Sequence, residues 1–393
     1  MPPDAPVQPQ PLPLSQPDSQ DALRGPIGQL VQNQRIIVCC GAGGVGKTTT
    51  SASLALAAAR AGRRVLVLTI DPSRRLAETL GVAQNPTAPV PLSPERLKAA
   101  RIHPPGALDA WLLSPRQIAD EAVRRLSGSR EQSERFFSNR VYQQLSQMLA
   151  GMHEYTAMEA LHRLLISGRY ELVVLDTPPS RNALDFLEAP GRLASLLDGR
   201  IFKALTPKKG GLFTRAASKI AQKGLSAALG DELAGELVQF MGTFATLLQF
   251  LNQDLKAMRA FLSGPDAAFL LVTAPTRQSL AEGFYFQSRA QELKLPFKGF
   301  VLNRSSLRRD RWTQEDQANL DAMPKTPILQ SGLRKLAAMA EIEAARQKRD
   351  QQVLDELNRR AGERGFAKSV PEFPQQGSDM DLLIATAREL CGE

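Results

Sequence analysis

A glycine-rich run near the amino terminus carries the residue types that hold phosphate groups. The run Gly41-Ala-Gly-Gly-Val-Gly-Lys-Thr48 matches the pattern G-x-x-x-x-G-K-[ST]. An apolar stretch typical of a strand precedes it and an alanine-rich stretch typical of a helix follows it, so backbone N–H groups and a helix N-terminus are expected to point at one spot. We predict that this loop binds the phosphates of a nucleoside triphosphate through Gly41, Gly43, Gly44, Val45, Gly46, Lys47, Thr48 and Thr49.

The chemistry of a bound triphosphate also needs cations and carboxylates. Lys47 is expected to reach the β- and γ-phosphates, and the Thr48 hydroxyl to coordinate Mg²⁺. Asp71 and Asp176 each follow an apolar strand-like run, and the carboxyl ends of strands flank the ligand crevice of an open α/β sheet. We predict that Asp176 supports the Mg²⁺ ion and that Asp71 orients the attacking water. Helix capping is the alternative role for either aspartate.

The choice of base is argued from a later strand. Guanine-selective proteins with such a loop usually carry an Asn-Lys-x-Asp run, whereas here the strand ends Val301-Leu-Asn-Arg-Ser-Ser306, without an aspartate. The amide of Asn303 can pair with the edge of adenine. The sequence therefore favours ATP over GTP.

The surrounding pattern predicts the scaffold. Apolar strand-like runs at 35–40, 64–70, 172–175, 269–273 and 299–303 alternate with helical stretches. Strands that are apolar on both faces indicate an α/β fold of the P-loop NTPase type, with a mostly parallel sheet covered by helices on both faces. Further helical stretches are expected at 117–168, 339–364 and 379–390, and a helical insertion at about 191–262.

Length and composition set the domain organisation. The 393 residues, 43% of them hydrophobic, suffice for one large α/β domain with insertions or for two domains. The first twenty positions hold seven prolines and four glutamines, so we predict a disordered tail over 1–28 and the ATPase domain over 29–393. No apolar run is long enough to span a membrane, no secretory signal is recognisable, and only three cysteines occur, which together favour a cytoplasmic location.

Much of the net charge of +9 lies in one segment. Seven basic residues and no acidic one fall between Gly199 and Leu225. The rest of the chain is nearly balanced, unlike a protein that binds nucleic acid, and no nucleic-acid partner is expected. Within the segment, residues 212–223 have the pattern of a basic amphipathic helix. Such a helix can contact anionic lipid or a client helix, or pack on the sheet with its lysines in water.

Four segments together resemble the ArsA-type anion-transporting ATPases, a family that includes the ATPases targeting tail-anchored proteins. They are GAGGVGKTTT, LTIDPSRRLAETLG, VVLDTPPSRNALDFL and VLNR, and the similarity runs from about Ile36 to the C-terminus. The resemblance implies a switch I carboxylate at Asp71, a switch II starting at Asp176 and an adenine reader at Asn303. By position, a loop over 370–373 that contains Pro371 is expected to wall the base pocket.

The sequence departs from this family at several positions. The family's signature lysine, which reaches a dimer partner's nucleotide, is replaced by Ala42. Candidates to supply the missing positive charge are Arg74, Arg75 and Arg181. We predict that Arg181 is a catalytic residue. The alternative is that all three are ordinary surface arginines in loops.

The three cysteines also differ from those of relatives that bind metals. Cys39 and Cys40 are adjacent on a predicted strand, so they point to opposite faces, and Cys391 lies near the C-terminus. No metalloid trio and no zinc-binding cysteine pair can be drawn from them.

Three functions are consistent with these residues. The first is a Mg²⁺-dependent ATP hydrolase that acts as a homo- or heterodimeric switch for a membrane protein or hydrophobic-helix client, cytoplasmic or peripheral to the inner membrane face. The second is a slowly hydrolysing, nucleotide-gated scaffold, because Ala42 replaces the lysine. The third is the energising subunit of an anion pump, although the cysteines argue against arsenite as the anion.

Overall fold

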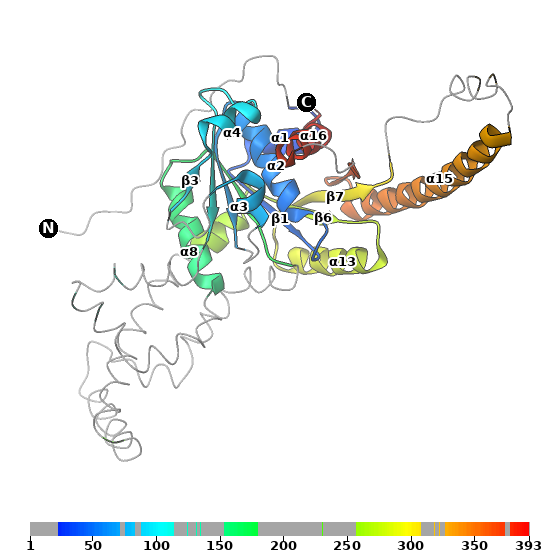
Figure 1. The fold of residues 1–393 in the computed structure, drawn as a ribbon. Coiled ribbons are helices and arrows are strands. Elements are labelled where there is room, and N and C mark those ends of the chain that lie inside the picture. Colours follow the sequence, from blue (N-terminus) through cyan, green and yellow to red (C-terminus); the bar gives the residue numbers. More distant parts are fainter. Residues whose placement is uncertain are drawn as a thin grey trace.

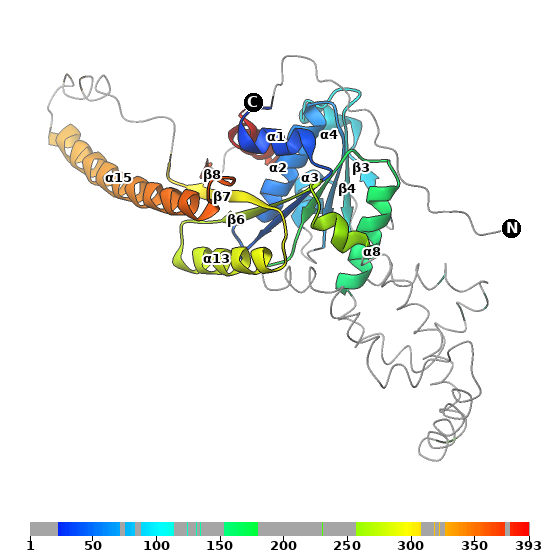
Figure 2. The same ribbon diagram turned by 180° about the vertical axis from the view of Figure 1, so that it is seen from behind.

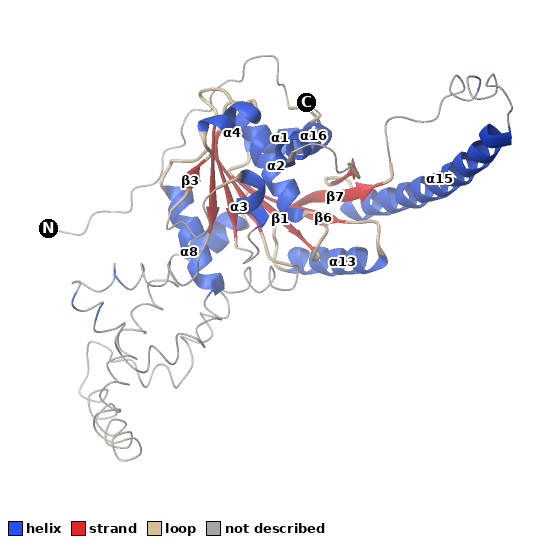
Figure 3. Ribbon diagram, in the orientation of Figure 1, coloured by secondary structure: helices blue, strands red, loops and turns tan. Residues whose placement is uncertain are grey.

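An eight-stranded sheet between two layers of helices forms the body of the protein (Figures 1 and 3). The computed structural model describes residues 23–70, 75–82, 88–113, 153–179, 257–307, 327–373 and 378–392, with six isolated positions besides. The strands are β1 Ile36–Gly41, β2 Arg64–Thr69, β3 Val90–Pro91, β4 Ala107–Leu112, β5 Leu172–Asp176, β6 Ala267–Thr273, β7 Phe297–Ser305 and β8 Phe366–Pro371. The helices are α1 Gly25–Asn33, α2 Lys47–Arg60, α3 Arg75–Leu80, α4 Pro94–Ala99, α8 His153–Ile166, α13 Arg277–Glu292, α15 Pro327–Ala361 and α16 Asp379–Cys391.

The strand order brings the ends of distant strands together. The order is β3-β4-β2-β5-β1-β6-β7-β8, and every pairing is parallel except β3 with β4. Asp176 at the end of β5 pairs in register with Cys39 of β1 on one side and Thr69 of β2 on the other. Parallel strands share one carboxyl edge, so residues that follow β1, β2 and β5 meet there.

Each face of the sheet has its own hydrophobic core. Helices α1, α2 and α16 cover one face, while α8, α13 and the C-terminal half of α15 cover the other (Figures 1 and 2). Cys39 packs in the first core and Cys40 in the second, as predicted from their adjacency. Burial raises the pKa of Cys39 to about 12 and raises that of Cys40 as well. Both side chains therefore remain neutral thiols that pack as small apolar groups.

The five strands predicted from the sequence are all present, but three others were missed. These are β3, β4 and β8. The expected boundary of the N-terminal tail at residue 28 is wrong, because α1 begins at Gly25 and buries Ile27 and Val31 on one face. Of the expected insertion at 191–262, the structure describes Gly230 and residues 257–262, and the latter are helical. The basic segment at 199–225 lies outside the described residues.

A buried arginine joins four elements at the amino edge of the sheet. The Arg63 guanidinium donates hydrogen bonds to the carbonyl oxygens of Val31, of Gln34 at 3.0 Å and of Glu171 at 2.6 Å. Its side chain connects the end of α1, the approach to β1 and the approach to β5 to the start of β2. Burial lowers the pKa of Arg63 to about 10, so the group is still charged at neutral pH.

We expect Arg63→Ala to lower the free energy of unfolding by about 3 kcal/mol, since three buried carbonyl groups lose a charged donor. The matched control is Arg64→Ala, whose side chain is 45% exposed and lies 3.6 Å from the Glu171 carboxylate. That change should cost less than about 1 kcal/mol. Urea denaturation of both variants measures the difference. Equal losses would contradict the assigned role of Arg63.

Candidate functional site

The glycine-rich loop connects β1 to α2 in the conformation that its glycines permit. Gly41, Gly44 and Gly46 have φ of 151°, 74° and 92°, a region that other residues rarely occupy. Gly46 precedes the first residue of α2, which is Lys47. A helix leaves its first N–H groups without an intrahelical acceptor, so the start of α2 can hold an anion.

Neighbouring elements also approach two of these glycines closely, and at Gly41 the neighbour is backbone that cannot move aside. A Cβ on Gly41 would lie 2.0 Å from the carbonyl oxygen of Val272 in β6. A Cβ on Gly46 would lie 2.1 Å from the Asn303 side-chain nitrogen. The loop is therefore held against β6 on one side and against the end of β7 on the other.

Lys47 folds back across the loop that precedes it. Its side chain is buried, and Nζ donates a hydrogen bond to the carbonyl oxygen of Ala42 at 2.8 Å. The Ala42 side chain belongs to the hydrophobic core on the α2 face of the sheet. Lys47 is thus the cation that the structure places within the loop itself, at the position where the sequence predicted phosphate contact.

A buried carboxylate stands beside the start of α2. Asp176 is 1% exposed, and its Oδ2 accepts hydrogen bonds from the Thr48 hydroxyl at 2.8 Å and the Thr69 hydroxyl at 3.1 Å. Hydroxyl and carboxylate oxygens are the ligands that Mg²⁺ prefers, usually together with waters and phosphate oxygens. This donor set fits a Mg²⁺-bound polyphosphate at the glycine loop. The structure thereby brings the predicted metal pair together and adds Thr69, which the sequence analysis missed.

The two expected switch segments both leave the sheet beside this loop. The backbone N–H of Ile70 donates to the carbonyl oxygen of Asp176 at 3.2 Å, and the Thr177 hydroxyl donates to the carbonyl oxygen of Cys39 at 2.8 Å. Pro179 lies 3.9 Å from an ideal Cβ on Gly43. Asp71, Arg74 and Arg181 lie outside the described residues. Arg75 is the exposed first residue of α3.

Asn303 contacts the glycine loop directly. Its side-chain nitrogen donates to the carbonyl oxygen of Val45 at 2.9 Å, and it lies near the end of β7. The next residue, Arg304, has a positive φ of 55°. The candidate adenine reader therefore also braces the loop, and its role toward a base stays a prediction.

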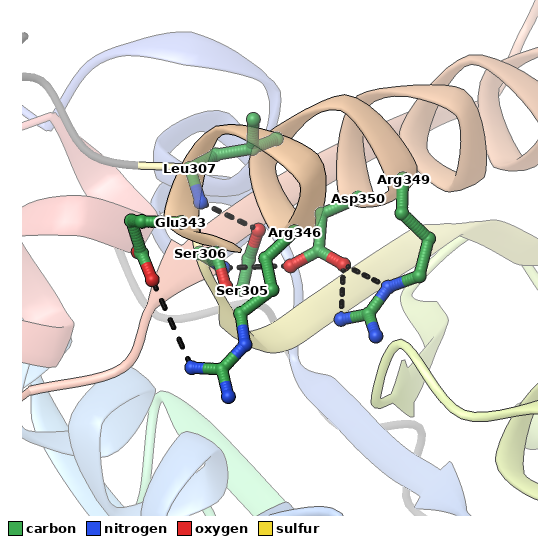
Figure 4. Close-up of polar contacts among 7 residues, drawn as sticks. All are labelled: Ser305, Ser306, Leu307, Glu343, Arg346, Arg349 and Asp350. Atoms are coloured by element: carbon green, nitrogen blue, oxygen red, sulfur yellow. Dashed lines mark hydrogen bonds and ion pairs between the residues drawn. The ribbon is translucent and has the colours of Figure 1, made fainter. Parts of the chain in front are cut away.

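A buried aspartate on α15 holds the chain that follows Asn303 (Figure 4). Asp350 is fully buried, and it accepts a hydrogen bond from the Ser306 backbone N–H at 2.7 Å and pairs with Arg349 at 2.7 Å. The Leu307 backbone N–H donates to the Ser305 hydroxyl at 3.1 Å. The burial of Asp350 was not predictable from the sequence, because one aspartate in a charged helix has no local mark of burial.

Pro371 lies beside the same end of β7, but in a strand. It is the last residue of β8 and pairs in register with Ser305, and the Glu372 backbone N–H donates to the Ser305 carbonyl oxygen at 3.0 Å. The expectation of a loop over 370–373 is therefore wrong for its first two residues. The pairing still places Pro371 at the carboxyl end of the sheet, where Asn303 also lies.

Two further features concern membrane-spanning helices and clusters of metal-binding side chains in the described residues. None of the helices within them has the length and the apolar content that crossing a membrane requires. In the same part of the chain, no three His, Cys, Asp or Glu side chains gather as metal ligands.

Comparison with known proteins identifies the family of the chain. The chain matches the family described as "Anion-transporting ATPase" over residues 34–317. It is 31% identical to the protein named ATPase get3 of Aspergillus terreus and 32% identical to that of Aspergillus niger, over 180 residues each. Those alignments cover 45% of this chain and 50% of each relative, so the chain spans about half the length of the curated relatives it matches. With its glycine loop, its strand-end aspartate and this match, the chain belongs to the anion-transporting ATPase family.

Proposed function

We propose that this protein binds and hydrolyses ATP with Mg²⁺ at the loop between β1 and α2. The observation that carries the proposal is the contact between Asp176 and Thr48 at the first turn of α2, next to the buried amine of Lys47. A hydroxyl, a carboxylate and an ammonium group converge there on a helix N-terminus. This set of groups can hold a metal-bound triphosphate and neutralise the charge that develops during its cleavage.

Each residue has a distinct role in this proposal. The backbone N–H groups of the glycine loop bind phosphate oxygens, and Lys47 exchanges the Ala42 carbonyl for the β- and γ-phosphates. Thr48 and Asp176 are the residues that would hold the Mg²⁺ ion. When bound, Mg²⁺ supplies positive charge that neutralises the triphosphate. Asp71 would orient the attacking water, because it follows Ile70, whose backbone N–H donates a hydrogen bond to the Asp176 carbonyl oxygen at the end of β5.

The proposal also covers the process that ATP hydrolysis would drive. We infer a homo- or heterodimeric switch that handles a membrane protein or a hydrophobic-helix client from the cytoplasm, at times on the inner face of the membrane. Support comes from the family and from the relatives named ATPase get3, each matched over about half its length. The basic segment at 199–225 is a candidate contact for such a client or for anionic lipid.

Slow or absent turnover is the second candidate function. The observation that favours it is Ala42, which is buried and offers the loop a carbonyl oxygen but no cation. A protein that binds ATP without cleaving it efficiently would act as a nucleotide-gated scaffold. The third candidate is the energising subunit of an anion pump, and arsenite is disfavoured as its anion because Cys39, Cys40 and Cys391 are all buried.

Calorimetry and a phosphate-release assay on the full chain test the proposal. Titration with ATP, with and without Mg²⁺, and with Mg²⁺ and GTP should show the strongest binding for Mg²⁺ with ATP. Repeated turnover at about 1 s⁻¹ or faster, the usual range of enzymes, would establish the hydrolase. Binding of ATP with turnover far below that rate, or with none, would establish the scaffold. An absence of binding would overturn both.

We expect Arg181→Ala to lower the turnover number by about 10²-fold and to change ATP affinity by less than about threefold, because a cation placed beside the γ-phosphate acts mainly on transition-state charge. The matched control is Arg359→Ala on α15, an exposed arginine far from the loop along the chain. It should leave both quantities unchanged. An unchanged turnover number in Arg181→Ala would remove this residue from the mechanism and shift attention to Arg74 or Arg75.

A further inference from the structure

Helix α15 has two halves with different surroundings. Its C-terminal half packs on the sheet, where Asp350 and Leu357 are fully buried. Its N-terminal half extends away from the sheet and from the other helices of the body, as both views show (Figures 1 and 2). The 35-residue helix is therefore an arm attached at one end.

The free half of the arm exposes large apolar side chains. Leu336 is 55% exposed, Met339 65% and Ile342 56%, and they are three residues apart, which places them along one side of the helix. Leu336 is separated from Asp350 and from Leu357 by multiples of seven residues. The side of α15 that packs on the sheet thus continues beyond it as an uncovered face. A gathered apolar stripe of this kind marks a contact surface more often than scattered exposed residues do.

We propose that a second copy of this chain covers the stripe, with the two α15 helices antiparallel about a two-fold axis at Met339. In that arrangement a residue that lies n positions before Met339 in one chain lies opposite the residue n positions after Met339 in the other chain. Leu336 then packs against Ile342 of the second copy, and the two Met339 side chains meet at the axis. Such a face is complementary to itself, as a two-fold contact requires.

Charge complementarity selects a second copy over another apolar partner. Lys335 and Glu343 lie four residues before and four residues after Met339, and both are on the side that carries it. Antiparallel pairing sets Lys335 of each chain against Glu343 of the other. Glu343 also lies 3.8 Å from Arg346 on its own helix, which keeps its carboxylate at this edge of the stripe. An unrelated apolar helix would not offer opposite charges to both Lys335 and Glu343.

The predicted contact is small and contains no residue of the nucleotide loop. The paired stretch from Lys335 to Glu343 spans about two and a half turns of each helix. It buries far less surface than the ~1,200–2,000 Å² of stable interfaces, so we expect a dissociation constant on the order of tens of micromolar. It goes beyond the proposed ATPase activity, because none of its residues belongs to the loop. Every experiment on it is therefore run without nucleotide, and its failure would leave the ATPase proposal unaffected.

Charge exchange tests the pairing in the full chain. Sedimentation up to about 200 µM should give a dimer whose dissociation constant rises about fivefold in Lys335→Glu and in Glu343→Lys, and returns to within about twofold of wild type when both changes are combined. The two residues are about 12 Å apart along one helix, so recovery cannot arise within a single chain. A wild type that stays monomeric, or a double exchange as weak as the single ones, overturns the proposal.

Cysteine crosslinking tests where the axis lies. Met339→Cys should form a disulfide-linked dimer on mild oxidation, because the axis brings the two residues together, and the native cysteines are buried. The matched control is Ala337→Cys, exposed on the opposite side of α15, which should not crosslink. Equal crosslinking at both positions overturns the assigned geometry. Binding of an added apolar helical peptide at Met339 by a monomeric wild type would assign the stripe to another occupant and overturn it too.

Discussion

Replacing Lys47 with alanine should lower the steady-state rate of ATP hydrolysis by about 10²- to 10³-fold, since it removes a buried cation from the point where phosphate charge develops. The geometry on which this expectation depends is the 2.8 Å hydrogen bond from Nζ to the Ala42 carbonyl oxygen. That bond places the amine inside the loop before any ligand binds. The measurement is phosphate release at saturating ATP, with affinity determined separately by calorimetry.

The control for Lys47 is a lysine that differs only in its surroundings. Lys98→Ala on α4 removes an exposed cation that the structure places outside the loop, and it should leave hydrolysis unchanged. Thermal unfolding of both variants checks that each is folded. If Lys47→Ala hydrolyses ATP at the wild-type rate, the site proposed between β1 and α2 is wrong.

The second large effect is expected from Gly41→Ala. A Cβ at this position would lie 2.0 Å from the Val272 carbonyl oxygen, which belongs to the backbone of β6 and cannot rotate away. The φ of 151° adds strain for any residue with a side chain. We expect the free energy of unfolding to fall by about 3 kcal/mol or more, and ATP binding to be lost with the separation of β1 from β6.

Gly44→Ala separates backbone strain from the steric clash. Gly44 also has a positive φ, at 74°, but nothing lies within 4 Å of its ideal Cβ. Its replacement should therefore cost only about 1–2 kcal/mol of unfolding free energy. Urea denaturation of the two variants measures the difference. Equal losses would show that the approach of Val272 does not limit position 41.

The strands that the sequence predicted are those with continuous apolar runs. Strand β4 was missed because Asp109 interrupts its apolar pattern. The structure buries this carboxylate by pairing it with the Arg169 guanidinium at 2.7 Å and the Tyr170 hydroxyl at 2.6 Å. Both partners are about sixty residues away in the chain, so no local pattern could indicate them.

The residues of the candidate site likewise fall into those with a local sequence signal and those positioned by contacts between distant parts of the chain. The glycine loop and Asp176 were predictable because their spacing and their place after apolar strands are local features of the sequence. Thr69 and Asp350 were not, since the first acts through a hydrogen bond to a different strand and the second through a contact between α15 and the chain after β7. Asp71 and Arg181 stay predictions, because neither lies in the described part of the chain.

The buried carboxylate of Asp350 connects the arm to the nucleotide loop. Asp350 fixes the Ser306 backbone to α15, and three residues earlier the Asn303 amide holds the Val45 carbonyl oxygen. A displacement of the outer half of α15 would be transmitted along the continuous helix to Asp350. From there the Ser306 and Asn303 contacts connect it to the glycine loop. A partner bound to the outer half of α15 would therefore be connected to the nucleotide loop through Asp350 and Asn303.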